Sequence, residues 1–233
     1  MSIQSDLQKV ANKEKAKFLA HYFKTGKGEY GEGDIFLGLT VPEMRAVAKK
    51  YRELPLAEIE QLLHNKIHEY RLTALLILNE QFGKTGGADR KKIITLYLHN
   101  TKYINNWDLV DLSAPNTLGI YLLDKPKERK ILFQFARSKN IWERRISVLA
   151  TFVFIKNGDF TDSFAIAVML LRDSHDLIHK AVGWMLREIG KRDQDAEETF
   201  LKKQYRVMPR TMLCYAIERF TPEKRTEYLL NPC

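Results

Sequence analysis

Apolar residues recur at steps of three and four positions along almost the whole chain, and no segment sustains the every-second-residue alternation of a half-buried strand. Helix starts are marked as well: Thr40 and Pro42 precede Glu43 in a capping pattern, and Pro222 follows Thr221. With 233 residues, of which 45% are hydrophobic, the chain can bury a sizeable core. The sequence therefore predicts an all-α fold of about a dozen helices joined by short turns.

A second pattern appears when the apolar helices are aligned on a basic residue near their start. Arg71, Arg145, Lys180 and Arg210 each precede an apolar face, at intervals of one or two repeats of about 30 to 40 residues. All-helical repeats of that length are typical of a HEAT- or armadillo-like solenoid, whose concave face takes one helix from every repeat. Inward-facing basic residues would line a concave groove that suits a duplex backbone. The alternative, that such residues are solvated or bridge neighbouring helices, stays open here.

The predicted organisation is a single α-solenoid domain over residues 1–233, with an N-terminal helix in 1–25, a connector in 24–34 and helical repeats in 35–233. The connector, KTGKGEYGEGD, is rich in glycine. It lacks the Gly-Lys-Ser/Thr ending and the preceding strand of a phosphate-binding loop, so we expect a flexible link rather than a nucleotide site.

The chain is basic, with 38 Lys and Arg against 29 Asp and Glu, a formal net charge of +9 and a pI near 9.4. That balance favours an acidic partner, either nucleic acid or an anionic membrane surface. No apolar run approaches the roughly 18 residues of a membrane span, and the N-terminus has no secretory pattern, so a cytoplasmic protein without a membrane partner is expected. Cys214 and Cys233 offer neither a disulfide framework nor metal-ligand spacing, and no metal or cofactor is predicted.

The segment NNWDLVDL places Trp107 and Asp111 four residues apart, with Asp108 between them. On a helix, the side chains of Trp107 and Asp111 share one face. Carboxylates would repel a polyanion, so their presence in a basic protein suggests that their charge has a use. Carboxylates, indoles and a nearby guanidinium could stabilise a cationic sugar during cleavage of an N-glycosidic bond. Spacing alone leaves this reading open beside a plain nucleic-acid-binding solenoid.

Four segments carry a family resemblance: FLGLTVPEMR (36–45), NNWDLVDLSAP (105–115), NIWERRISVL (140–149) and HKAVGWMLREIGK (179–191). Together they resemble the AlkD-like DNA alkylation-repair glycosylases, which are HEAT-like solenoids. The similarity runs in the family's order from about residue 15 to 220, and the Trp-Asp-x-Val-Asp and Gly-Trp-x-Leu-Arg-Glu segments are its most specific parts.

By motif, the resemblance implies that Asp111 is the catalytic carboxylate, that Trp107 and Trp184 face the sugar, and that Arg145 lies in the groove. Tyr22 matches more loosely a tyrosine near the first repeat. The chain departs from the family in its longer glycine-rich insertion. It also has Asp176 and Leu177 where family members can carry aromatic residues. The further residues expected to bind DNA are basic: Lys180, Arg71, Arg210 and Arg144.

The resemblance implies hydrolytic release of cationic N3- and N7-alkylated purines from duplex DNA, with the base largely stacked and without a metal or cofactor. A cationic purine is already a good leaving group, so no general acid is needed. The expected partner is double-stranded DNA containing alkylated bases, and the expected setting is a monomer in the bacterial cytosol. Two alternatives remain: a non-catalytic solenoid that binds damaged or branched DNA, and a scaffold for protein interactions.

Overall fold

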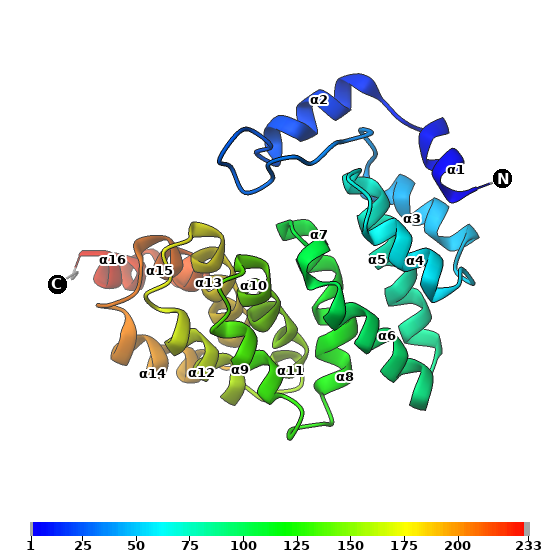
Figure 1. The fold of residues 1–233 in the computed structure, drawn as a ribbon. Helices are drawn as coiled ribbons and strands as arrows, with labels where there is room; N and C mark the ends of the chain where they lie inside the picture. The colour runs from blue at the N-terminus through cyan, green and yellow to red at the C-terminus, as the bar shows by residue number, and fades with distance from the viewer. Residues whose placement is uncertain (1, 231–233) are drawn as a thin grey trace. The chain divides into compact units, whose positions relative to one another are not determined.

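The computed structural model describes residues 2–230 and is helical throughout that range, apart from turns and one isolated parallel bridge between Ile35 and Ile67. The all-α class predicted from the periodicity is therefore confirmed. The chain forms two compact units, Met1–Ser113 and Ala114–Cys233. Figure 1 shows both, with the first coloured blue to green and the second green to red. The expected single domain, its solenoid form and its basic groove stay predictions.

Three helices of the first unit, those that start at Ile3, Lys13 and Val41, begin after residues that cap them. The residue Asn12 accepts the backbone N–H of Lys15 at 3.0 Å, and Glu43 accepts that of Thr40 at 2.7 Å. The predicted N-terminal helix is divided into two at Asn12. The elements are α1 (Ile3–Lys9), α2 (Lys13–Tyr22), α3 (Val41–Lys50), α4 (Leu56–Leu63), α5 (His68–Lys84), α6 (Gly87–His99), η1 (Thr101–Tyr103) and α7 (Trp107–Ser113).

Helix α5 is the centre of the first unit. It packs against α3, α4, α6 and α7. Because neighbours surround it, its residues are buried on nearly all sides, including Leu75, Ile77 and Leu78. At its N-terminus, the charged side chains of His68 and Arg71 contact residues that are more than 30 positions away in the sequence.

The second unit is built around α13. This helix packs against α10, α12, α14 and α15, and Gly183 lets α15 approach so closely that a Cβ there would lie 2.4 Å from the carbonyl oxygen of Met212. The elements are η2 (Pro115–Gly119), α8 (Ile120–Leu122), α9 (Lys130–Ala136), α10 (Ile141–Ala150), α11 (Phe152–Lys156), α12 (Thr161–Leu170), α13 (Asp176–Gly190), α14 (Gln194–Gln204), α15 (Arg210–Ala216), η3 (Ile217–Arg219) and α16 (Pro222–Leu230).

The glycine-rich segment 24–34 forms a series of turns that its own side chains stabilise. Glu29 accepts the backbone N–H of Gly26, and Glu32 accepts that of Gly28, both at 2.8 Å. No strand precedes the segment within the described residues. Its last residue, Asp34, is buried among charged groups of α5.

Cys214 is a half-buried free thiol, and Cys233 lies outside the described residues. Among residues 2–230, no group of three or more His, Cys, Asp or Glu side chains is arranged to hold a metal ion. No helix in that range is long and apolar enough to cross a lipid bilayer.

Candidate active site

Helix α7 carries Trp107 and Asp111, the two residues that the segment NNWDLVDL places four positions apart. Trp107 is its first residue and Asp111 stands one turn later, and both side chains are partly exposed. Between them, Asp108, Leu109 and Val110 are buried. Since residues four apart share a face of a helix, α7 presents the indole and the carboxylate together at the surface of the first unit.

Aromatic rings from the end of α2 pack against this tryptophan. The ring of Phe23 stacks on that of Trp107 with centroids 5.1 Å apart, and Tyr22 meets Trp107 edge to face at 6.0 Å. Phe23 is buried, whereas Tyr22 keeps 52% of its surface exposed. The structure thus brings together two of the residues expected from the resemblance, Tyr22 and Trp107, and adds Phe23 as the ring that supports the indole.

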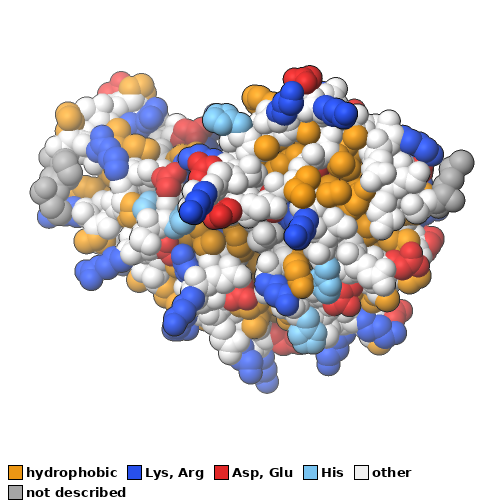
Figure 2. Space-filling view, turned by 45° about the horizontal axis from the view of Figure 1, so that its top comes forward, with side chains coloured by type: hydrophobic (Ala, Val, Ile, Leu, Met, Phe, Trp, Pro, Cys, Tyr) orange, Lys and Arg blue, Asp and Glu red, His pale blue; other side chains and the backbone are white. Residues whose placement is uncertain are grey.

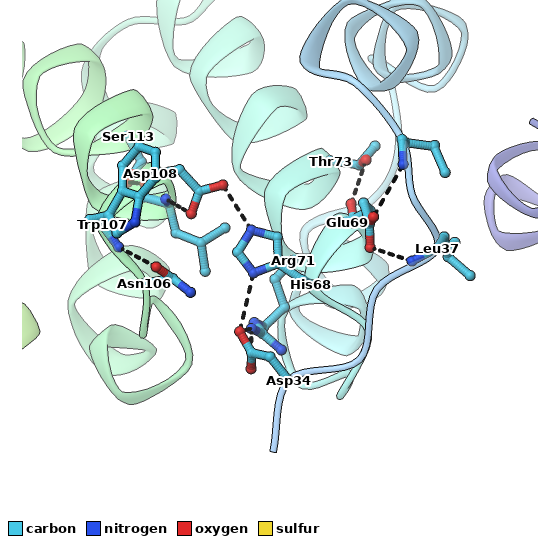
Figure 3. Close-up of polar contacts among 12 residues, drawn as sticks. Asp34, Leu37, His68, Glu69, Arg71, Thr73, Asn106, Trp107, Asp108 and Ser113 are labelled. Atoms are coloured by element: carbon cyan, nitrogen blue, oxygen red, sulfur yellow. Dashed lines mark hydrogen bonds and ion pairs between the residues drawn. The ribbon is translucent and has the colours of Figure 1, made fainter. Parts of the chain in front are cut away.

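A chain of buried charges lies beneath α7. Arg71 donates to both carboxylate oxygens of Asp34 at 2.8 Å, and Asp34 accepts from Nδ1 of His68 at 3.2 Å. The other ring nitrogen of His68, Nε2, lies 2.8 Å from Oδ2 of Asp108. Figure 3 shows the imidazole between the two carboxylates, with Asp108 on α7 and Asp34 on the loop. The network therefore joins α7 to the N-terminus of α5 and to the end of the glycine-rich segment.

The electrostatics of this network favour a charged imidazole. Burial by itself would lower the pKa of His68, but the negative charge of Asp108 and the hydrogen bonds to Asp108 and Asp34 raise the pKa to about 9. Burial would likewise raise the pKa of Asp34, and its bonds to His68 and the charge of Arg71 lower it instead. At neutral pH the four groups are two cations and two anions, so their charges cancel.

A second buried carboxylate shapes the loop before α3. Glu69 accepts the backbone N–H groups of Leu37, Gly38 and Leu39 at 2.9, 2.8 and 3.2 Å. Gly38 has a φ of +87°, and a Cβ there would lie 2.1 Å from the carbonyl oxygen of Asn12. Beside this loop is a cavity of about 360 Å³ whose walls are mainly apolar, including Phe18, Tyr22, Phe23, Phe36, Met44 and Leu72.

Three basic residues that were expected to contact DNA form hydrogen bonds or ion pairs within the protein. The side chain of Arg71 is 4% exposed, and besides Asp34 it binds the carbonyl oxygen of Asn65 at 3.0 Å. Arg144 pairs with Asp173 at 2.6 Å. Arg145 is buried as a residue and donates to the carbonyl oxygen of Leu177 at 2.5 Å. These positions argue against direct phosphate contacts by Arg71 and Arg144, because their guanidinium groups already have buried partners.

The other predicted residues of the second unit lie nearer the surface. Lys180 is partly exposed and pairs with Asp176 at 2.7 Å, and Arg210 is exposed and donates to the carbonyl oxygen of Leu229. Trp184 is partly exposed, and its indole N–H lies 3.3 Å from Glu188. On the face drawn in Figure 2, Lys and Arg side chains are scattered among acidic and uncharged ones. That face shows no continuous basic stripe.

Reasoning from the sequence missed His68, Asp34 and Phe23. A histidine three residues before an arginine at the start of a helix, with an aspartate ending the preceding glycine-rich segment, was the available signal. This signal was weak because Asp34 and Asp108, the hydrogen-bond partners of His68, lie 34 and 40 residues from it in the sequence.

The sequence profile of the DNA alkylation repair enzyme family matches residues 3–220. The chain belongs to that family. Membership supports a role as an enzyme of DNA repair with DNA as its substrate, in line with the predicted resemblance. No curated protein matches the chain.

Two solved structures share the fold. A protein described as a predicted DNA alkylation repair enzyme from Enterococcus faecalis is 18% identical, with a TM-score of 0.72, and the match covers 91% of this chain and 97% of that one. The protein smu.31 from Streptococcus mutans UA159 is 17% identical, with a TM-score of 0.54 over 78% of this chain and 92% of its own. At these identities the likeness concerns the fold alone.

Proposed function

We propose that this family member is a DNA glycosylase that hydrolyses the N-glycosidic bond of cationic N3- and N7-alkylated purines in duplex DNA. The observation that carries the proposal is the face of α7, which presents Trp107 and Asp111 together beside Tyr22. The resemblance assigns these residues to the family's motif positions. A carboxylate and a tryptophan exposed together on a basic protein suit a cation better than a phosphate.

The chemistry follows from the charge of the substrate. An alkylated purine leaves with the electron pair of the C1′–N bond and becomes neutral, while the sugar becomes an oxocarbenium ion. The Asp111 carboxylate stabilises that ion electrostatically and orients the water that attacks C1′. The indole of Trp107 adds cation–π attraction, and the water's proton passes to solvent once the C1′–O bond has formed. Roles for Trp184 and Arg145, both in the second unit, rest on the resemblance.

The decisive experiment replaces Asp111 by Asn and measures release of 7-methylguanine from methylated duplex DNA by chromatography. We expect the single-turnover rate to fall by about 10² to 10³, the range typical of a lost charge-stabilising group, while duplex binding persists. Asp89→Asn, at an exposed carboxylate paired only with Lys92 on α6, is the matched control and should retain full activity. Full activity in Asp111→Asn would disprove the assignment.

Binding is tested separately through its salt dependence. If the partly exposed Lys180 contacts a phosphate, Lys180→Ala should weaken duplex binding and reduce the slope of log K against log salt by about one. An unchanged slope would remove Lys180 from the interface. A wild-type protein that binds duplex DNA but releases no alkylated base would favour the non-catalytic alternative, a binding protein for damaged or branched DNA.

A further inference from the structure

We propose that His68, in its imidazolium form, is the positioning residue that fixes α7 and thereby the placement of Trp107 and Asp111. The positional part of this inference concerns the first unit alone. Its consequence for catalysis rests on the proposed function.

The hydrogen-bond geometry requires two N–H groups on the ring. Nδ1 of His68 faces Asp34 Oδ2 at 3.2 Å, and Nε2 faces Asp108 Oδ2 at 2.8 Å. An ionised carboxylate only accepts hydrogen bonds, so both ring nitrogens must donate. A neutral imidazole has one N–H, and its second nitrogen would point a lone pair at a carboxylate oxygen. One of the two links would then become repulsive in a buried environment, where such a contact is costly.

Two structural routes connect His68 to the exposed face of α7. The first is covalent: Asp108 is adjacent to Trp107, and while its Oδ2 binds His68, its Oδ1 accepts the backbone N–H of Leu109 at 2.9 Å. The carboxylate therefore fixes the first turn of α7. The second is through rings, because Phe23 packs on His68 at 5.0 Å and on Trp107 at 5.1 Å. A shift of the imidazole would reach the indole by both routes.

The charged groups around His68 determine how the loss of its proton changes the net charge of the buried network. The loop before α3 supplies Asp34, α7 supplies Asp108, and α5 itself supplies Arg71. The rings of Phe23 and Phe36 cover the imidazole without adding charge. Removal of the proton leaves two carboxylates against one guanidinium, a net buried charge of −1. The expected response is separation of Asp108 from the ring, because the contact between Nε2 and Oδ2 is the one that loses its proton.

Asp108→Asn distinguishes positioning by charge from a merely structural role. The Asn oxygen can keep the bond to Leu109, and its NH₂ group can donate to Nε2 of a neutral His68 whose Nδ1–H still binds Asp34. The network is then complete and neutral without the extra proton. The variant should hold α7 in place, and its placement should no longer depend on pH.

The first experiment follows the Trp107 indole N–H and the His68 ring nitrogens by ¹⁵N NMR between pH 6 and 10, using the full chain. In wild type we expect the indole signal to move together with His68, whose pKa lies at about 9. In Asp108→Asn, the indole signal should stay constant. His64→Gln is the control, since His64 is exposed and bonds Asn100, and it should titrate like wild type. An indole signal that ignores the titration of His68, or one that still moves in Asp108→Asn, would overturn the proposal.

The second experiment measures single-turnover base release over the same range, after subtraction of release from enzyme-free DNA. Because the pKa of His68 lies at about 9, the imidazolium fraction and the wild-type rate should fall about tenfold from pH 8 to pH 10, whereas the rate of Asp108→Asn should change less than about twofold. An equal alkaline loss in both proteins would overturn the catalytic consequence. A wild type that releases no base at any pH would instead refute the proposed function, and the NMR result would still decide whether His68 positions α7.

Discussion

Replacement of Arg71 by Met tests whether this arginine is an internal clamp or a DNA contact. The variant removes two bonds to Asp34 and those to the carbonyl oxygens of Asn65 and Lys66, at distances from 2.8 to 3.3 Å. It leaves a buried carboxylate whose only remaining cation is His68. Loss of one partner from a buried ion pair costs about 3–5 kcal/mol, and the remaining histidine places the expected cost near the lower end, at about 3 kcal/mol.

The assay must report on the first unit alone. Trp107 is the one tryptophan of that unit, so a background with Trp142→Phe and Trp184→Phe makes fluorescence during urea unfolding specific to it. A loss of about 3 kcal/mol lowers the urea midpoint by about 1–3 M for m values of 1–3 kcal/mol/M. Arg71→Lys keeps the charge but not the paired bonds and should lose less.

The same variants separate the two roles of the arginine. Without urea, and at a temperature where Arg71→Met is folded, the slope of log K for duplex binding against log salt should equal that of wild type. A slope reduced by about one, together with a stability loss below about 1 kcal/mol, would refute the clamp and restore Arg71 as a phosphate contact.

Two further outcomes follow from buried groups away from α7. Burial raises the pKa of Glu197 from 4.5 to about 8, so the folded second unit keeps a proton that the unfolded chain releases, and its stability should fall as pH rises from about 4.5 to 8. Glu197→Gln should remove that dependence in urea unfolding followed by circular dichroism and gain about 4 kcal/mol at pH 8. Parallel pH profiles for the two proteins would contradict the prediction. Gly38→Ala should cost about 2 kcal/mol or more in the Trp107 assay, because φ is +87° and Asn12 leaves no room. Gly83→Ala, which meets nothing within 4 Å in α5, should instead gain about 0.5 kcal/mol, and equal effects at the two glycines would refute the argument.

The sequence predicts local features of this protein well and long-range pairs poorly. Helical periodicity and the cap at Thr40 depend on residues within a few positions, so the all-α class and the placement of Trp107 and Asp111 on one helix follow from local sequence. The ion pair of Arg71 depends on Asp34, which reaches it only through the fold of the first unit. A basic residue before an apolar face is compatible with a solvated, a phosphate-binding or an internally bonded side chain. Periodicity does not choose among them.

The recurring position lies one residue before the predicted one in two of the helices, α10 and α13. Arg71 is the fourth residue of α5 and donates to the carbonyl oxygens six and five positions before it. Arg144, not Arg145, is the fourth residue of α10 and does the same. His179, the fourth residue of α13, binds the carbonyl oxygen six positions before it. The recurring feature is therefore a side chain that fastens the turn before its own helix.

Helix α7 departs from this arrangement, and the departure gives His68 its importance. Its fourth residue is Val110, which has no group to donate to the preceding turn. The first turn of α7 is held instead from its second residue, Asp108, by the imidazole of His68. The arginine anchors of α5 and α10 are thus replaced in α7 by a histidine whose two hydrogen bonds depend on a titratable proton. The helix that carries Trp107 and Asp111 therefore has an anchor that depends on charge, which is why the pH dependence of their placement is the sharpest test of the proposal.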